Sequence, residues 1–185
     1  MNHEDRMKST IMHKNFFDQA QFAIERGYYL ESIMYEYAAI ESRLEVICGL
    51  LGCPCNREID DTIRSKINIS QRIKCLKAMY KKHPACKDST TKVTSEIWKR
   101  LQDWIDERNK YVHGLYKRPD LYVKRLEDRN QLAIDGLKLA KYFYNEAKRI
   151  RRISNDHPEL MIYDDKICRN KSCKANPLSN DKRQE

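Results

Sequence analysis

The sequence predicts an all-α protein, an antiparallel bundle of four to five helices over residues 14–153 with a mostly irregular C-terminal tail over residues 154–185. Apolar residues recur every three or four positions along most of the chain, which is the period of an amphipathic helix. No stretch alternates between apolar and polar residues as a half-buried strand would. The 185 residues include only five glycines and five prolines, too few for the turns of a sandwich, a barrel or a doubly wound sheet.

The clearest of the expected helices lies between Tyr28 and Leu51. Its apolar positions step alternately by three and four residues, at Leu30, Ile33, Tyr37, Ile40, Leu44, Ile47 and Leu51. The charged residues between these positions, which give the helix its polar side, are Glu31, Glu36, Glu41, Arg43 and Glu45. Gly52 and Pro54 follow directly, and both residue types end helices.

Four further helices follow from the same periodicity, over residues 15–24, 69–82, 92–113 and 120–152. The dipeptide His83-Pro84 ends the second of these, because a residue before proline avoids the helical conformation. Gly114 is expected to end the next helix in a left-handed conformation. Residues 53–68 are expected to form a loop, and residues 85–91 a polar link.

The chain shows no sign of a membrane or secretory segment. No window holds about 18 successive apolar residues, and the N-terminus is charged where a signal peptide would be apolar. We therefore expect a soluble cytoplasmic protein. Its seven cysteines, an odd number at irregular spacing, suit free thiols in a reducing compartment. Cys48 and Cys75 fall inside expected helices and suit small core positions.

Two cysteine pairs raise a zinc site as an alternative. Cys53-Pro-Cys55 and Cys168-x4-Cys173 could together offer four thiolates to one ion. Their spacings differ from those of the common zinc fingers and ribbons, and the two pairs lie far apart in the sequence. We therefore expect neither a metal nor a cofactor.

The net charge of +9 is unevenly distributed along the chain. Residues 1–61 carry a net charge of −5, residues 62–118 carry +10, and residues 119–150 and 151–185 carry +2 each. A stretch this basic attracts polyanions, of which nucleic acid is the commonest. The other interpretation is a solvated basic face that offsets the acidic first third of the chain.

The candidate catalytic groups are Arg108, Asn109 and His113, near the end of the fourth expected helix and inside the basic stretch. Arg108 shares a helical stripe with Leu101 and Trp104, so it occupies a position that the pattern reserves for an apolar residue. Asn109 and His113 lie one turn apart on a neighbouring polar stripe. His113 also falls in the expected last turn, where free carbonyl groups favour the imidazolium.

RNA cleavage without a metal needs groups of this kind. The 2′-hydroxyl must lose a proton and the 5′-oxygen must gain one, which suits histidine. The negatively charged transition state needs a fixed cation with planar donors, which suits arginine. Lys110, Lys117 and Arg118 flank His113 and could bind substrate phosphates.

The pattern Arg108-Asn109-x3-His113, late in a helical bundle, resembles the motif of the HEPN superfamily (higher eukaryotes and prokaryotes nucleotide-binding). The resemblance implies a metal-independent endoribonuclease with RNA as substrate, of the kind found in toxin–antitoxin pairs, abortive-infection systems and CRISPR-associated effectors. It implies a homodimer in which two motifs face each other in one cleft, and an antitoxin or other regulatory partner. Under this resemblance Arg108 and His113 are the catalytic pair, and Asn109 supports or positions them.

One position departs from the pattern of the toxins that a nucleotidyltransferase silences. Those toxins have a tyrosine two residues after the histidine, whereas this chain has Leu115 there and Tyr116 next. Control by adenylylation therefore does not follow from the resemblance.

Two other interpretations of the segment stay open. Arg108 could pair with Glu41 or Glu45 while His113 caps its helix, and the bundle could be a non-catalytic module that binds nucleic acid or protein. The tyrosines of the second helix could stack on bases, although helical spacing favours packing in a core or a dimer. These are Tyr28, Tyr29, Tyr35 and Tyr37.

Overall fold

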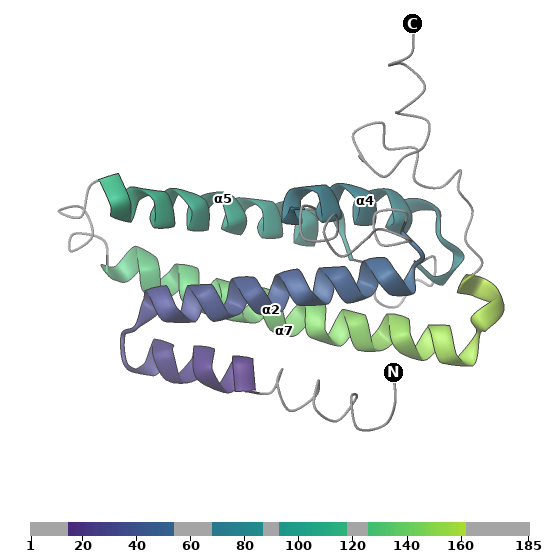
Figure 1. Ribbon diagram of the computed structural model, residues 1–185, viewed down its shortest axis with the longest axis horizontal. Coiled ribbons are helices and arrows are strands. Elements are labelled where there is room, and N and C mark those ends of the chain that lie inside the picture. The colour runs from purple at the N-terminus through teal and green to yellow at the C-terminus, as the bar shows by residue number, and fades with distance from the viewer. Residues whose placement is uncertain (1–14, 54–67, 87–92, 118–125, 162–185) are drawn as a thin grey trace, which may run out of the picture. The chain divides into compact units, whose positions relative to one another are not determined.

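The computed structural model describes residues 15–53, 68–86, 93–117 and 126–161. These residues form five α-helices and two short 3₁₀ helices, and no strand occurs among them (Figure 1). The predicted all-α class is therefore confirmed. In this part of the chain, no helix combines the length and the hydropathy needed to cross a membrane.

The helix bounds agree most closely with the predicted ones in the first half of the chain. The α-helices are residues 15–25, α2 (Tyr29–Leu50), α4 (Ile69–Lys82), α5 (Ser95–Lys117) and α7 (Leu126–Asp156). The 3₁₀ helices are η2 (Pro84–Cys86) and η4 (Pro158–Met161). Gly27 and Gly52 lie on either side of α2 with φ of 76° and 65°, a left-handed conformation that glycine adopts without a steric penalty.

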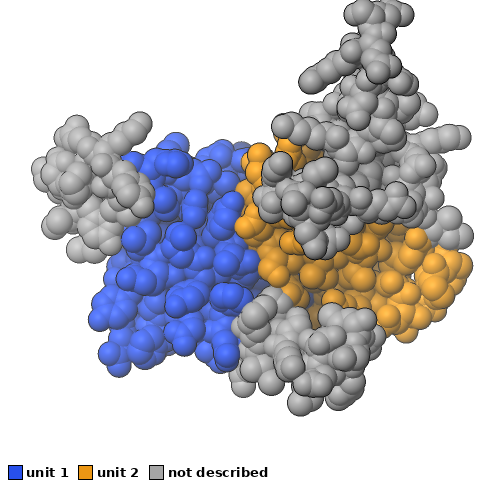
Figure 2. Space-filling model, viewed as in Figure 1, with its two compact units in different colours: residues 1–40, 99–144 blue, residues 41–98, 145–185 orange. Residues whose placement is uncertain are grey.

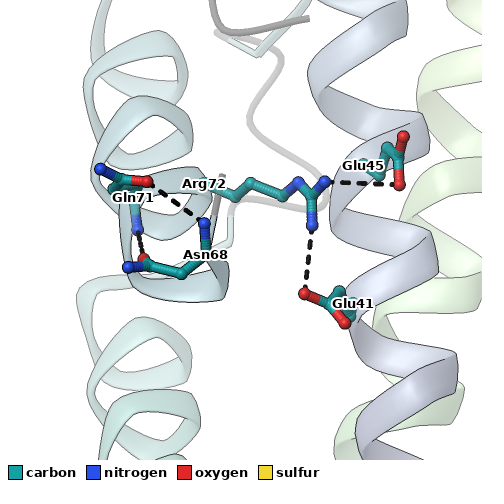
Figure 3. Close-up of polar contacts among 5 residues, drawn as sticks. All are labelled: Glu41, Glu45, Asn68, Gln71 and Arg72. Carbon is teal, nitrogen blue, oxygen red and sulfur yellow. Dashed lines mark hydrogen bonds and ion pairs between the residues drawn. The ribbon is translucent and has the colours of Figure 1, made fainter. Parts of the chain in front are cut away.

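Helix α4 has the predicted bounds because local signals define both of its ends. The Asn68 side chain accepts a hydrogen bond of 2.9 Å from the Gln71 backbone N–H, and the Gln71 side chain accepts one of 3.2 Å from the Asn68 N–H (Figure 3). This reciprocal capping box satisfies two N–H groups that the helix leaves free. At the other end, His83 is extended and precedes Pro84.

The predicted end of α5 was wrong. The helix continues through Gly114 to Lys117, and Gly114 is not among the residues with positive φ. A glycine inside a helix costs only about 1 kcal/mol relative to alanine, so it does not end a helix by itself. The next residue, Arg118, precedes Pro119 and is therefore disfavoured in the helical conformation, which places the stop signal four residues later than expected.

Two predicted irregular segments begin with helical structure. The expected polar link starts with η2, in which Ala85 and Cys86 are buried. The expected tail starts with the last residues of α7 and with η4. The expected loop up to residue 67, the start of the last helix before residue 126, and residues 162–185 lie outside the described residues.

The chain divides into two compact units (Figure 2). Unit 1 consists of residues 1–40 and 99–144, and unit 2 of residues 41–98 and 145–185. Each unit has a core of its own.

In unit 1, contacts between helices define how they run. Ser32 of α2 hydrogen-bonds the Ala20 carbonyl oxygen at 3.0 Å, so the first helix packs on α2. Between α5 and α7, Arg129 lies over the ring of Tyr111, while the indole of Trp104 bonds the Leu132 carbonyl. Because residue numbers rise on one helix as they fall on the other, α5 and α7 are antiparallel here. The largest fully buried side chains of unit 1 are Ile33, Ile40, Leu101, Ile105 and Phe143.

In unit 2, a buried polar network accompanies the apolar core. The Tyr80 hydroxyl donates a hydrogen bond of 2.6 Å to Glu146, and Arg149 donates two, of 2.7 and 2.8 Å, to the same carboxylate. The ring of Tyr80 also makes an edge contact with Trp98. The largest fully buried side chains of unit 2 are Leu44, Ile47, Leu51, Ile73, Leu76, Met79 and Ile150.

The cysteines of the described residues are buried thiols and not disulfides, as predicted for Cys48 and Cys75. Cys53 and Cys86 are also buried thiols, and burial raises the pKa of Cys86 to about 12. Among the described residues, no group of three or more His, Cys, Asp and Glu side chains is arranged to hold a metal ion. The other three cysteines of the zinc alternative lie outside the described residues.

Candidate active site

Trp104 fixes the part of α5 that carries the candidate motif in unit 1. It is 4% exposed, and its Nε1 donates a hydrogen bond of 2.9 Å to the carbonyl oxygen of Leu132 in α7. Gly136 lies one turn further along α7, and a Cβ there would lie 2.6 Å from the Trp104 ring. The absence of that Cβ lets the ring lie against the α7 backbone. These contacts of Trp104 fix the rotation of α5 about its own axis. They therefore also fix the direction in which the motif residues point, one turn later.

Arg108 is half-buried, and three side chains hold its guanidinium group. Its Cζ lies 4.2 Å from the centroid of the Tyr37 ring in α2, which is a cation–π arrangement. Nη1 donates a hydrogen bond of 3.1 Å to Asn109 Oδ1, and Nη2 donates one of 3.3 Å to Met34 Sδ. An arginine on an apolar stripe is therefore accommodated by stacking and hydrogen bonding.

The guanidinium group of Arg108 still has donors to offer. It carries five N–H groups, of which the bonds to Asn109 and Met34 use two. Its Nε is buried without a hydrogen-bond partner among the described residues. The thioether of Met34 is a weak acceptor, so a phosphate oxygen would be a stronger partner for the same donor. The cation is held in position while much of its hydrogen-bonding capacity remains.

The acidic partners considered for Arg108 bind a different arginine. Glu41 and Glu45 of α2 pair with Arg72 of α4 inside unit 2, at 3.2 and 3.5 Å (Figure 3). The Arg72 side chain is 7% exposed, so its charge needs both carboxylates. The alternative in which Glu41 or Glu45 neutralises Arg108 is therefore wrong.

Asn109 and His113 lie one turn apart on α5. Asn109 is half-buried, and its Oδ1 accepts from Arg108, which leaves its amide N–H groups to donate elsewhere. His113 is exposed and makes no hydrogen bond within the described residues. Residues five positions apart on a helix differ in direction by about 140°, so Arg108 does not contact His113. Arg108 therefore hydrogen-bonds Asn109, whereas His113 is exposed to solvent.

The longer α5 also changes the surroundings of His113. The last carbonyl groups of the helix belong to residues 114–117, because α5 ends at Lys117 rather than at His113. His113 is therefore one turn away from the helix end, and its predicted place in the last turn was wrong. Its exposure leaves it open to solvent and to an external substrate.

Of the three residues expected to bind phosphate, only Lys110 is described in full. Its Nζ lies 2.6 Å from Glu107 Oε1, and this hydrogen bond raises the pKa of Lys110. Both side chains are exposed, so a substrate phosphate could compete for the ammonium group. The side chain of Lys117 and the whole of Arg118 lie outside the described residues.

Sequence reasoning missed the side chains from α2 that hold Arg108. Tyr37 lies on the apolar seam, where helical spacing favours packing, while Met34 lies off the seam and is 47% exposed. One signal could have found the contact between Arg108 and Tyr37. On each of the two helices, a single residue does not fit the apolar stripe. Tyr37 is the aromatic residue among Leu and Ile, and Arg108 is the cation after Leu101 and Trp104.

A buried carboxyl group behind the site was also missed. Glu36 was expected on the polar side of α2, yet it is 1% exposed because the first helix, α5 and α7 cover that side. The Ser32 hydroxyl lies 3.0 Å from the Ala20 carbonyl oxygen and 2.6 Å from Glu36 Oε1. A hydroxyl has one proton for two acceptors, so both bonds form when Glu36 itself is protonated and donates to Ser32. Burial raises the pKa of Glu36 to about 8, which keeps it neutral near pH 7.

Comparisons of the chain with protein-family models, with curated proteins and with solved structures found no match. The chemistry of the site therefore has to be argued from its own residues. These are the stacked guanidinium of Arg108, the carboxamide of Asn109 beside it and the exposed imidazole of His113.

Proposed function

We propose that this chain is a metal-independent endoribonuclease of the HEPN type that cleaves RNA in the cytoplasm. The observation that carries the proposal is the guanidinium of Arg108, which is half-buried, fixed on Tyr37 and Asn109, and paired with no carboxylate among the described residues. A charged group held in this way meets the requirement of a transition state in which negative charge develops on a phosphate. An arginine in a purely structural role would be expected to have a carboxylate partner.

His113 is the group that moves protons in this proposal. As a base, one imidazole takes the proton of the 2′-hydroxyl, whose oxygen then attacks the neighbouring phosphorus. The bond from phosphorus to the 5′-oxygen breaks, and that oxygen takes a proton from a second imidazole. The products are a 2′,3′-cyclic phosphate and a 5′-hydroxyl. Each chain supplies one such histidine, so a homodimer with its two-fold axis beside His113 would supply both.

The carboxylates near the motif are engaged by neighbouring side chains and do not form a cluster. Asp106 accepts a hydrogen bond of 3.0 Å from Gln102, and Glu107 pairs with Lys110. Nucleases that use two metal ions need several carboxylates to hold the ions about 3.5–4 Å apart. The nucleophile in the proposal is therefore the 2′-hydroxyl, and DNA, which lacks it, should not be cleaved.

The resemblance to HEPN proteins supplies the biological setting of the proposal. An endoribonuclease of this kind would act as a toxin, in abortive infection or in another defence or stress response. Such an activity has to be restrained in a healthy cell, which implies an antitoxin or another regulatory partner.

The test is to incubate the purified protein with mixed RNA beside Arg108→Ala and His113→Ala variants. Each variant should lose about 10²–10⁴-fold in cleavage rate, the usual contribution of one acid–base or charge-stabilising group. Arg100→Ala and His157→Ala are matched controls, because both residues are exposed and lie outside the motif. Both controls should cleave as the wild type does, and circular dichroism should show native helix content in all four variants.

The products distinguish the mechanism from its competitors. Cleavage should continue in EDTA and leave 2′,3′-cyclic phosphate ends, with sedimentation showing a dimer at micromolar concentration. Cleavage that disappears in EDTA and returns with Mg²⁺ would contradict the proposal, as would efficient cutting of single-stranded DNA. RNA binding without cleavage, by the wild type and the Arg108→Ala variant alike, would instead identify a non-catalytic binding module.

A further inference from the structure

Among the helices that carry the basic stretch, the excess positive charge lies on α4 and not on the helix with the candidate motif. The 14 residues of α4 include five basic residues and no acidic one. The 23 residues of α5 include five basic residues and four acidic ones. The attraction for polyanions that the sequence predicts is therefore concentrated on α4, in unit 2, whereas α5 is nearly neutral.

Three lysines of α4 form one line along its outer side. Lys74, Lys77 and Lys81, here called the lysine stripe, follow each other at spacings of three and four residues, so they lie within about 60° of one another and span about 10 Å. Lys74 and Lys81 are exposed and Lys77 is half-buried. The buried residues of α4 centre on the opposite side, at Ile69, Arg72, Ile73, Cys75, Leu76 and Met79.

The lysine stripe is unfavourable for the isolated helix. Like charges three or four residues apart destabilise a helix by about 0.2–0.5 kcal/mol per pair, and the stripe contains two such pairs. Elsewhere in the chain some lysines have an acid at this spacing, as in Glu107 with Lys110 and Asp135 with Lys138. The helix dipole favours lysines in the last turn, which accounts for Lys81.

The dipole does not account for Lys74 and Lys77, which lie in the middle of α4. Among the described residues, the one cation of α4 with carboxylate partners is Arg72, which faces Glu41 and Glu45 on the buried side (Figure 3). No ion pair engages the three lysines of the stripe within the described residues. Their charge is therefore left available to an external anion.

We propose that the lysine stripe binds the phosphate backbone of single-stranded RNA and so holds the substrate outside the catalytic motif. Successive ammonium groups along one line match a chain of successive phosphates, and binding would remove the repulsion between them. Lysine contacts to phosphate position a strand without reading its bases, so the stripe would contribute affinity and no sequence preference. The choice of RNA as the polyanion rests on the proposed function.

The test measures binding of a fluorescent 2′-O-methyl oligouridine, which has no free 2′-hydroxyl and cannot be cleaved by the proposed mechanism. The variant Lys74→Gln/Lys77→Gln/Lys81→Gln should bind roughly tenfold more weakly than the wild type at low salt. Its slope of log affinity against log salt concentration should be smaller by about 2, because each phosphate contact to a single strand contributes about 0.7. Glutamine keeps a high helix propensity, and the variant should be slightly more thermally stable, so weaker binding will not reflect misfolding.

The matched control is Lys99→Gln/Lys138→Gln/Lys141→Gln, which removes the same charge from exposed positions of α5 and α7. It should bind as the wild type does. Equal affinities of the stripe variant and the control would overturn the inference, and would point to a general effect of net charge. An inactive wild type whose binding still depends on the stripe would refute the proposed nuclease alone. Loss of cleavage in Arg108→Ala with unchanged binding in the stripe variant would refute the stripe alone.

Discussion

The guanidinium of Arg108 lies over the ring of Tyr37, with 4.2 Å between Cζ and the ring centroid. The contact joins the one cation on the apolar stripe of α5 to the one aromatic residue on the seam of α2. A cation on an aromatic face keeps its charge while losing freedom of movement, and the contact leaves the in-plane N–H groups free to donate. Tyr37 is therefore a positioning residue for the proposed reaction.

Replacement of Tyr37 should lower turnover strongly only when the aromatic ring is removed. Tyr37→Phe keeps the aromatic face and should retain most of the cleavage rate. Tyr37→Leu removes that face and should lower kcat by about tenfold to a hundredfold, since a displacement of about 1 Å in a catalytic group can cost 10²-fold. Single-turnover cleavage of a defined RNA would measure both effects, and equal rates for the two variants would show that the ring does not position Arg108.

Glu36 should make the stability of the protein depend on pH. Its pKa is about 8 in the folded chain and 4.5 when unperturbed, so between these values the folded state binds a proton that the unfolded state does not. Stability should therefore fall as pH rises through this window, by at most about 1.4 kcal/mol per pH unit, and level off above pH 8. The Glu36→Gln variant should lack this decrease in urea unfolding measured from pH 6.5 to 8.5.

His83 sets the lower limit of that pH range. Burial lowers the pKa of His83 below 6.5, so the unfolded state binds the extra proton and the contribution of His83 to stability rises with pH in this range. Between pH 6.5 and about 7.5 the unfolded state loses this proton, so the rise due to His83 becomes smaller than the decrease due to Glu36, and above about pH 7.5 that decrease can be measured alone. A wild type with constant stability from pH 6.5 to 8.5 would show that Glu36 is not held neutral.

Two glycine-to-alanine substitutions should have opposite effects. A Cβ at Gly136 would overlap the Glu36 carboxyl and the Trp104 ring, so Gly136→Ala should destabilise unit 1 by about 1–3 kcal/mol. Nothing lies within 4 Å of a Cβ at Gly114, which is helical. Gly114→Ala should stabilise the protein by about 0.5–1 kcal/mol. Destabilisation by Gly114→Ala would instead indicate a left-handed residue and an α5 that ends at His113.

The start of α4 should depend on Asn68 and not on Ser70. Asn68→Ala removes a side-chain cap and should cost about 0.5–2 kcal/mol in urea unfolding. Gln71→Ala removes the reciprocal bond and should cost less. Ser70→Ala, one position inside the first turn, should leave the free energy of unfolding nearly unchanged. Similar losses for Asn68→Ala and Ser70→Ala would argue against the capping box.

The bounds of α4 could be predicted because its signals are local, whereas the end of α5 could not. Asn68, Gln71 and Pro84 act within a few residues of the helix they delimit. Gly114 is of the residue type that most often follows the end of a helix, but a glycine ends a helix only if the chain leaves the helical conformation there. The residues up to Lys117 continue the helix, and a sequence pattern does not weigh that continuation against the glycine.

The candidate site could be predicted as a set of residue types and not as a set of contacts. Arg108 was found because it breaks the apolar stripe, and its half-buried position agrees with that observation. Its contacts with Tyr37 and Met34 depend on how α2 and α5 are aligned within unit 1, which spacing along one helix does not specify. Glu36 was wrongly expected on an exposed side of α2 for the same reason. Helical periodicity identifies one buried side of α2, whereas the neighbouring helices also cover a second side.

The chain has two tryptophans, and they divide between the units although they lie only six positions apart in α5. Trp98 makes its edge contact with Tyr80 in unit 2, and Trp104 lies beside Gly136 and Glu36 in unit 1. Each unit thus contains its own intrinsic fluorophore. In Trp98→Phe the emission would report on unit 1 alone, and in Trp104→Phe on unit 2 alone. Coincident melting curves from the two variants would mean that both units unfold as one cooperative system, and separate curves would assign a melting temperature to each.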